Sequence, residues 1–337
     1  MQVGFTTSFP VEIIFAAGHT PVDLNNIFIN NEPQKRVQEA EFKGFPRNIC
    51  SWIKGIYDTV LVSDIKTVIG VVQGDCSNTH SLMSLLQDKG VEVIPFSFPY
   101  NKDRKMLERE IKKLEVRFQV TDHQVQEVKE RLDEIRKDLL ELDRLTYQER
   151  KVTGAENHLW LVSSSDFNGD PVKFSKGLRL FLQEANDREP RKLSSNSIDK
   201  RQREIRLAYI GVPPIFTDLY QYLPEQRADI IFNEVQRQFS MPYLKEDIVE
   251  QYLTFTYPYT VFDRLEDIKR EIDNRQIDGI ISYSQAFCHR QIDNILLKKY
   301  LKLPFLTIEG DQPTCLDERT KLRLESFLDV IRFNMKN

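Results

Sequence analysis

Three cysteines in this sequence lie at or near the expected N-termini of helices, beside strand ends. Cys76 follows the apolar run 67–72 and Cys288 follows the run 277–282, while Cys50 opens a helical segment. Backbone N–H groups and the dipole at a helix N-terminus favour a thiolate or an anionic cluster. The repeated placement indicates a site built from thiolates. The alternatives are a buried thiol without a ligand role for each cysteine taken alone, and coincidence, since strand-to-helix loops are common in α/β proteins.

The separations between these cysteines limit the kind of site. Cys50, Cys76 and Cys288 are 26 and 212 positions apart, unlike the short CxxC knuckles of zinc fingers, so distant loops must assemble the site. Three thiolates suit an iron–sulfur cluster that leaves one iron without a cysteine ligand, and residue type alone leaves a three-cysteine zinc site open. Cys315 lies outside the pattern. Four cysteines are too few for a disulfide framework, so we expect free thiols or ligands in a reducing compartment.

Motifs of the common nucleotide and hydrolase sites are absent. The sequence contains no GxGxxG, no GxxxxGKS/T, no GxSxG and no HExxH. The sequence therefore gives no strong evidence for dinucleotide binding, P-loop chemistry, serine hydrolysis or zincin chemistry. We therefore expect the chain itself neither to bind nor to hydrolyse ATP.

The rest of the chain must bring three distant loops together, and its pattern predicts an α/β protein with parallel sheets. Short apolar runs alternate with helical segments in both halves, and ligands of such sheets bind at the carboxyl ends of the strands. The expected strands are 67–72 and 91–98 in the first half and 205–210, 228–232, 277–282 and 304–309 in the second.

Two domains are expected, at 1–204 and 205–337, because the strand-turn-helix pattern restarts at the start of the second. The first carries a highly charged helical hairpin at about 102–150, which we interpret as packing on its own domain rather than as a coiled coil or a partner-binding arm. A polar segment at about 186–203 is typical of a linker or exposed loop. The final helix, at 317–333, should pack on the second sheet.

Local patterns near the proposed site give further expectations. The continuous apolar run 11–17 predicts a strand, followed by a turn and a helix through Asn25. The helix after the third cysteine is amphipathic, with Ile292, Ile295 and Leu296 on one face. A βαβ unit would then place the third cysteine at the carboxyl edge of the second sheet.

Composition is that of an ordinary globular protein with room for a sizeable core. The 337 residues are 40% hydrophobic and 29% charged, with a formal net charge of −4. That charge gives no reason to expect a nucleic acid or an acidic membrane as a partner. No apolar run approaches the roughly 18 residues of a membrane span, and the N-terminal residues lack the basic segment of a signal peptide. We expect a cytoplasmic protein.

Seven segments together carry a resemblance to a known family. They are FAAGHTPVDL, NICSWIKG, GDCSNT, YIGVPP, DGIISYSQAFCH, LPFLTIEGD and RTKLRLESF. With them the chain resembles, over most of its length, the D-component family of 2-hydroxyacyl-CoA dehydratases and benzoyl-CoA reductases. By position, Cys50, Cys76 and Cys288 match the family's cluster cysteines, whereas Cys315 matches no common ligand.

The resemblance implies a fold and a cofactor. The expected fold is two flavodoxin-like (Rossmann-like) parallel-sheet domains with a helical insertion, and the expected cofactor is a 4Fe-4S cluster held by the three matching cysteines. Two of these cysteines come from the first domain and one from the second, so the cluster should lie in the cleft between the domains. Such clefts favour ligands, and His19, Ser51 and Glu309 are candidate walls of a substrate pocket there.

The resemblance also implies an oxygen-sensitive lyase and its partners. The reaction would be radical elimination of water from a 2-hydroxyacyl-CoA, through a ketyl radical formed after one-electron activation by a separate ATP-dependent iron–sulfur activator protein. The chain would pair with a homologous second subunit or form a homodimer. The alternatives are a small-molecule reductase with an 8Fe-9S double-cubane cluster, as in some family members, and a non-catalytic electron-transfer subunit.

Overall fold

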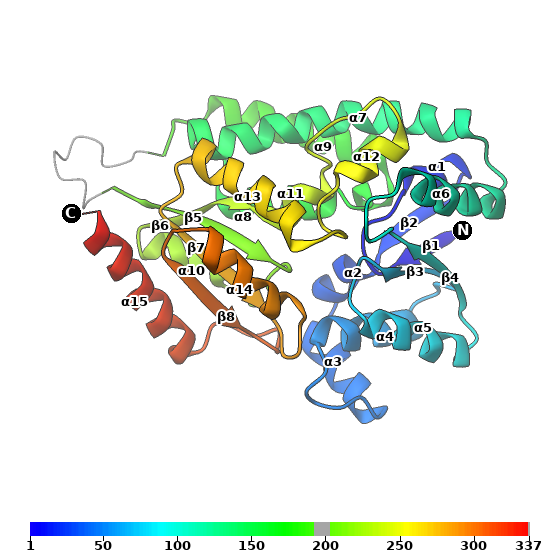
Figure 1. Ribbon diagram of the computed structural model, residues 1–337, viewed down its shortest axis with the longest axis horizontal. Helices are drawn as coiled ribbons and strands as arrows, with labels where there is room; N and C mark the ends of the chain where they lie inside the picture. The colour runs from blue at the N-terminus through cyan, green and yellow to red at the C-terminus, as the bar shows by residue number, and fades with distance from the viewer. Residues whose placement is uncertain (192–202, 336–337) are drawn as a thin grey trace.

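Runs rich in β-branched residues form two four-stranded sheets in this computed structural model, which describes residues 1–191 and 203–335 (Figure 1). All neighbouring strands are parallel, in the orders β2-β1-β3-β4 and β6-β5-β7-β8. Both orders follow the flavodoxin-like pattern, so the predicted fold class is confirmed. The strands are β1 Gln2–Phe5, β2 Thr20–Asp23, β3 Thr67–Gln73, β4 Glu92–Ser97, β5 Ile205–Gly211, β6 Ala228–Asn233, β7 Gly279–Ser284 and β8 Phe305–Glu309.

Helices connect the strands and cover the sheets. In the first half they are α1 Glu12–Ala16, α2 Leu24–Asn30, α3 Pro33–Phe42, α4 Ser51–Val62, α5 Asn78–Asp88, α6 Arg104–Phe118, α7 Asp122–Arg144, α8 Gly154–Ser163 and α9 Pro171–Asp187, with a short π-helix at Leu145–Glu149 and a 3₁₀-helix at Phe167–Gly169. In the second half they are α10 Leu219–Glu225, α11 Glu234–Phe239, α12 Ile248–Thr254, α13 Val261–Arg275, α14 Arg290–Tyr300 and α15 Glu318–Asn334. No helix of the described residues is long and apolar enough to cross a membrane.

The charged segment 102–150 forms two helices, α6 and α7. Thr121 begins α7 with a capping box, in which its hydroxyl accepts from the Gln124 N–H and the Gln124 side chain accepts from the Thr121 N–H. Figure 1 shows α7 and α9 running together along one side of the molecule. The polar segment expected at 186–203 falls mostly on residues 192–202, which lie outside the described part of the chain.

The apolar run 11–17, expected to be a strand, is instead the helix α1. The first strand is β1, and α1 is the crossover that leads from β1 to β2, the strand formed by part of the expected turn. A short continuous apolar run fits a buried helix as well as a buried strand, so its length and composition could not decide between them. Glu12 is fully buried in α1, where its carboxylate pairs with Arg136 of α7 at 2.7 Å.

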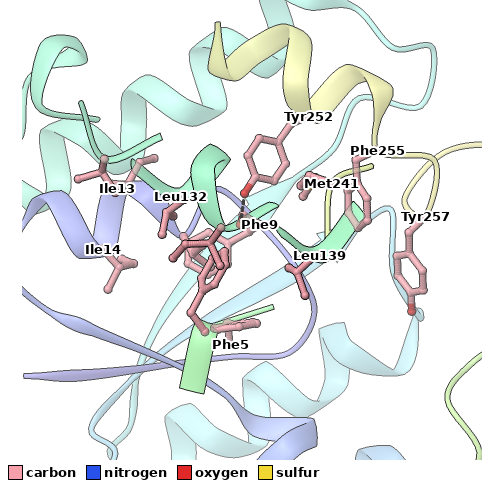
Figure 2. Close-up of a cluster of buried hydrophobic side chains, with 14 of the residues drawn as sticks. Phe5, Phe9, Ile13, Ile14, Leu132, Leu139, Met241, Tyr252, Phe255 and Tyr257 are labelled. Atoms are coloured by element: carbon pink, nitrogen blue, oxygen red, sulfur yellow. Dashed lines mark hydrogen bonds between the residues drawn. The ribbon is translucent and has the colours of Figure 1, made fainter. Parts of the chain in front are cut away.

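The core beside the first sheet is built from both halves of the sequence (Figure 2). Phe5 and Phe9 near the N-terminus and Leu139 of α7 pack in one cluster with Tyr252 and Phe255 from the second half. The Tyr252 hydroxyl donates to the Phe9 carbonyl oxygen at 2.8 Å. The segment between β6 and β7 therefore covers the first sheet.

The core beneath the second sheet also contains side chains from the first half of the chain. Phe28 of α2 and Val37 of α3 belong to the cluster beneath the second sheet, together with Leu324 and Leu328 of α15. The last helix thus packs on the second sheet, as the sequence predicts. Because each core contains side chains from both halves of the chain, the carboxyl ends of the two sheets are held in a fixed relative position.

The buried face of α14 differs from the predicted one. Ile292 and Ile295 are 69% and 70% exposed, whereas Asn294 and Leu297 are buried. The Ser282 hydroxyl of β7 donates to the Asn294 side-chain oxygen at 2.8 Å, so the helix packs on the sheet through the face that carries Asn294 and Leu297. The apolar spacing correctly indicates a helix here, but it gives the wrong side as the one that packs.

Candidate functional site

Both sheets contribute the loops at the carboxyl ends of their strands to a single cavity of about 290 Å³. The lining includes Thr6 and Thr7 after β1, Asp75 and Cys76 after β3, Val212, Pro213, Pro214 and Phe216 after β5, and Gln285, Phe287 and Cys288 after β7. This is where a parallel sheet is expected to hold a ligand. The cavity is also bordered by the first turns of α4 and by α8.

Three of the four cysteines line this cavity, and each comes from a different loop. Cys50 is the residue before α4, Cys76 lies between β3 and α5, and Cys288 lies between β7 and α14. All three are free thiols, and the fourth, Cys315, is an exposed free thiol that does not line the cavity. We call the face formed by Cys50, Cys76, Cys288 and Gln285 the cysteine wall.

Gln285 joins the two halves of the cysteine wall. Its side-chain oxygen accepts a hydrogen bond from the Cys50 thiol at 3.0 Å and from the Ser51 backbone N–H at 2.6 Å. Its side-chain nitrogen donates to the Tyr283 hydroxyl oxygen at 3.3 Å. Gln285 is fully buried, so it fixes the start of α4 against the end of β7.

Burial keeps two of these thiols protonated in the protein alone. It raises the pKa of Cys50 to about 12 and the pKa of Cys76 to about 11, and neighbouring cysteines add to the shift because each thiolate would repel the next. Backbone N–H groups at the start of α4 and α5 act in the opposite direction. Converting several thiols to thiolates here requires a positively charged partner, as in a metal site.

A buried cation lies next to the cysteine wall. Arg290, the first residue of α14, donates to the Tyr257 carbonyl oxygen at 3.2 Å, and its guanidinium lies 4.3 Å from the centre of the Tyr257 ring. The Tyr257 hydroxyl donates to Asp75 at 3.3 Å. Arg290 is the sole Lys or Arg among the described residues that line the cavity. Its charge favours anionic groups at the neighbouring thiols.

A second part of the cavity lining carries a neutral histidine beside apolar residues. We call this face the α8 wall; it is formed by His158, Leu159 and Val162 of α8 with Phe216 and Tyr220. His158 stacks on Tyr220 with ring centres 4.8 Å apart. Burial lowers the pKa of His158 to about 4, so the ring is neutral near pH 7.

The close approach of α8 to the second sheet depends on Gly154, its first residue. A Cβ atom at this position would collide with the Ile230 carbonyl oxygen of β6. Thr153 precedes it and forms a capping box with Glu156, in which Glu156 accepts from the Thr153 N–H at 2.9 Å. These two features place the histidine one turn further along, at the cavity.

The three residues expected to form pocket walls do not line the cavity. His19 precedes β2, at the amino edge of the first sheet, where its ring lies 6.1 Å from the Phe118 ring. The prediction that His19 lines the pocket is wrong, because α1 returns the chain to the amino edge of the sheet before β2 begins. Ser51 lies behind the cysteine wall, where its hydroxyl donates to the Asp311 carbonyl oxygen. Glu309 ends the edge strand β8 with an exposed side chain.

Several site residues were not anticipated from the sequence. Gln285 and Asp75 follow the ends of β7 and β3, so the rule that ligands bind at the carboxyl ends of strands could have selected them. Arg290 is two positions from Cys288 and could have been proposed as its counter-charge. Tyr257 and His158 gave no such signal, because only the packing of distant segments brings them to the cavity.

The three thiols share one cavity but do not form a site for a single metal ion. No three His, Cys, Asp or Glu side chains of the described residues lie close enough together to bind a single ion. The three thiols nevertheless share one cavity, interact electrostatically and approach it from separate loops. A polynuclear cluster bridges wider ligand separations than a single ion, and thiolates are its usual protein ligands.

Comparison with known proteins places most of the chain in a described family. The family model described as 2-hydroxyglutaryl-CoA dehydratase, D-component, matches residues 6–331. This match contains all three cavity cysteines and both walls of the cavity. A search of curated proteins found no match.

Proposed function

Because the chain belongs to the 2-hydroxyglutaryl-CoA dehydratase D-component family, we propose that it is the iron–sulfur subunit of a 2-hydroxyacyl-CoA dehydratase-like enzyme. The reaction would remove water from a 2-hydroxyacyl-CoA after one-electron activation by a separate ATP-dependent activator protein. The chain would act with a homologous second subunit or as a homodimer. The observation that carries the proposal is the convergence of Cys50, Cys76 and Cys288 on one cavity.

These three residues would be the ligands of a 4Fe-4S cluster. When bound, such a cluster supplies one-electron redox chemistry and Lewis acidity. The chain supports thiolate ligands through the backbone N–H groups at the starts of α4 and α5 and through the buried charge of Arg290. A thiol-bound cluster of this kind requires a reducing compartment, so the proposal places the protein in the cytoplasm.

The remaining cavity residues would bind and orient the substrate. Leu159, Val162 and Phe216 offer an apolar surface to an acyl chain. Arg290 is already held by Tyr257, and the described lining contains no other Lys or Arg. The phosphates of a CoA ester would therefore lie outside the cavity, with the thioester end inside.

Anaerobic purification tests the proposal directly. A single cubane predicts about four irons and about four sulfides per chain, with an EPR signal after reduction. The purified homodimer, or the chain with its homologous second subunit, combined with the activator and ATP, should then dehydrate members of a panel of 2-hydroxyacyl-CoA esters. Iron and sulfide in the 8Fe-9S ratio would favour the double-cubane reductase instead. A loaded cluster without turnover of any ester would favour an electron-transfer subunit.

A further inference from the structure

A chain of directional hydrogen bonds fixes the side-chain amides behind the α8 wall, and it begins at a buried carboxylate. Asp143 pairs with Arg275 at 2.5 Å, and both are buried. Burial alone would raise the pKa of Asp143, but Arg275 and Arg237 lower it below its ordinary value. The ionised carboxylate can only accept hydrogen bonds, so Asn157 must turn its NH₂ group toward it, at 3.1 Å.

The orientation passes from Asn157 to the next amide. The Asn157 oxygen is left to accept from the Asn233 NH₂ group at 2.8 Å. The Gly154 carbonyl oxygen accepts from the same NH₂ group at 3.3 Å, and a carbonyl can only accept, so it fixes Asn233 independently. The Asn233 oxygen therefore faces Tyr220 and accepts its hydroxyl hydrogen at 2.6 Å.

Tyr220 then decides the orientation of Gln236. Its single hydrogen is used on Asn233, so the oxygen presents a lone pair to the Gln236 NH₂ group at 3.5 Å. The same NH₂ group lies 3.0 Å from Nδ1 of His158. In this orientation the Gln236 oxygen is buried and has no donor among the described residues. In the opposite orientation the Gln236 oxygen would face the lone pair of the Tyr220 hydroxyl, and the two oxygens would repel each other.

The histidine tautomer follows from this chain. Nδ1 of His158 accepts a hydrogen from Gln236, so the neutral ring carries its proton on Nε2. Within the described residues Nε2 has no hydrogen-bond partner, and the ring lines the cavity. Stacking on Tyr220 restrains rotation of the ring. The α8 wall thus presents a fixed N–H donor beside the apolar side chains of Leu159 and Val162.

We propose that His158 is a ligand-binding residue that donates a hydrogen bond from Nε2 to an uncharged oxygen, the thioester carbonyl of an acyl-CoA. The identity of the ligand rests on the proposed function, while the tautomer rests on the hydrogen bonds alone. A neutral donor favours a carbonyl or hydroxyl oxygen over a carboxylate, which would need a cation to offset its burial. The cavity's cation, Arg290, is engaged by Tyr257.

The tautomer is tested by ¹⁵N NMR of histidine-labelled protein, with the His158 signals assigned by their loss in His158→Phe. We expect Nδ1 to show the shift of an unprotonated nitrogen and Nε2 that of a protonated one. Gln236→Glu replaces the donor with a carboxylate oxygen, so the proton should move to Nδ1. A wild-type protein with its proton on Nδ1 overturns the inference, whatever the protein's function.

The donor role is tested by binding of two probes, butanoyl-CoA and S-butyl-CoA, which lacks the carbonyl oxygen. His158→Phe should weaken binding of butanoyl-CoA by about three- to tenfold, the value of one neutral hydrogen bond, and leave S-butyl-CoA unchanged. The matched control is His123→Phe on the exposed face of α7, which should change neither affinity. Equal losses for both probes would mean that the histidine only packs, and would overturn the donor role.

Failure of the two proposals can be told apart. If wild-type protein binds neither probe, the acyl-CoA ligand is wrong and falls with the proposed function. The NMR experiment uses no ligand, so it still decides whether His158 presents Nε2–H to the cavity. If both probes bind and the tautomer is the opposite one, the proposed function stands and the role of His158 falls.

Discussion

The cysteine wall and the α8 wall face the same cavity but are built in opposite ways. The cysteine wall consists of loop residues, and burial makes the Cys50 and Cys76 thiols costly to ionise in the protein alone. The α8 wall is a helix surface backed by hydrogen bonds that reach a buried ion pair. The buried thiols of the first wall would become thiolates only with a positively charged bound group, whereas the hydrogen bonds behind the second wall are made without a ligand. Ligand loss should therefore affect the first far more than the second.

The largest effect on stability is expected at the anchor of the α8 wall. Arg275→Met removes the closer of the two arginines that pair with Asp143, at 2.5 Å against 3.4 Å for Arg237, and it also removes one partner of the buried Glu271. Buried carboxylates are left with less compensating charge, so we expect a loss of about 3–5 kcal/mol in the free energy of unfolding, measured by denaturant titration. The double variant Arg275→Met with Asp143→Asn should recover part of this loss. Lys137→Met, which breaks an exposed pair with Glu134, is the control and should cost less than about 1 kcal/mol. A small effect of Arg275→Met would contradict the anchoring role.

A somewhat smaller loss of stability is expected for substitutions on the buried face of α14, the helix that follows Cys288 of the cysteine wall. Leu297→Ala removes a buried side chain and should cost about 2–5 kcal/mol. Ile295→Ala lies on the exposed face of the same helix and should change stability by about 0.5 kcal/mol or less. Both are measured by urea unfolding of the isolated chain. The reverse order would show that the apolar stripe expected from the sequence packs after all.

Loss of the hydrogen bonds that Gln285 makes within the cysteine wall should reduce stability by a smaller amount. Gln285→Leu leaves the buried Ser51 N–H without an acceptor, at an expected cost of about 1–3 kcal/mol in the metal-free protein. Gln312→Leu, at an exposed position nearby in the sequence, is the matched control and should be close to neutral. An unchanged unfolding midpoint for Gln285→Leu would mean that this glutamine does not hold the two halves of the wall together.

A further expected effect is a pH dependence of stability from the α8 wall. The folded pKa of His158, about 4, lies below the ordinary 6.5, so the unfolded chain binds more protons between these values. Stability should therefore fall as the pH decreases from 6.5 toward 4. Tyr220 and Gln236, which face the ring, are uncharged there. In His158→Gln the decline should be shallower, and parallel curves for the two proteins would contradict a neutral buried histidine.

The sequence predicts the parts of this molecule that depend on local pattern. Strands β3 and β5 and the loop positions of Cys76 and Cys288 follow from apolar runs that end in small and polar residues. The run 11–17 fails because a short apolar segment fits both a helix and a strand. That error moves His19 from the carboxyl edge of the sheet to its amino edge.

The cavity itself depends on contacts that no local pattern contains. Tyr257 reaches the cysteine wall because the segment after β6 crosses to the first sheet, and His158 reaches the α8 wall because Gly154 lets its helix approach β6. Gln285 lies in a run that looks like the end of an ordinary strand. Its role emerges only when Cys50, 235 positions earlier in the chain, donates to its side chain.

We propose that three thiols from both halves of the chain bind one cluster, and the iron content of cysteine variants checks this proposal. Cys50→Ser, Cys76→Ser and Cys288→Ser, purified without oxygen, should each lose most of the iron and sulfide that the wild-type chain holds. Cys315→Ser, at the exposed thiol outside the cavity, should retain the wild-type content. Full iron content in any of the three cavity variants, or an equal loss in Cys315→Ser, would contradict the claim.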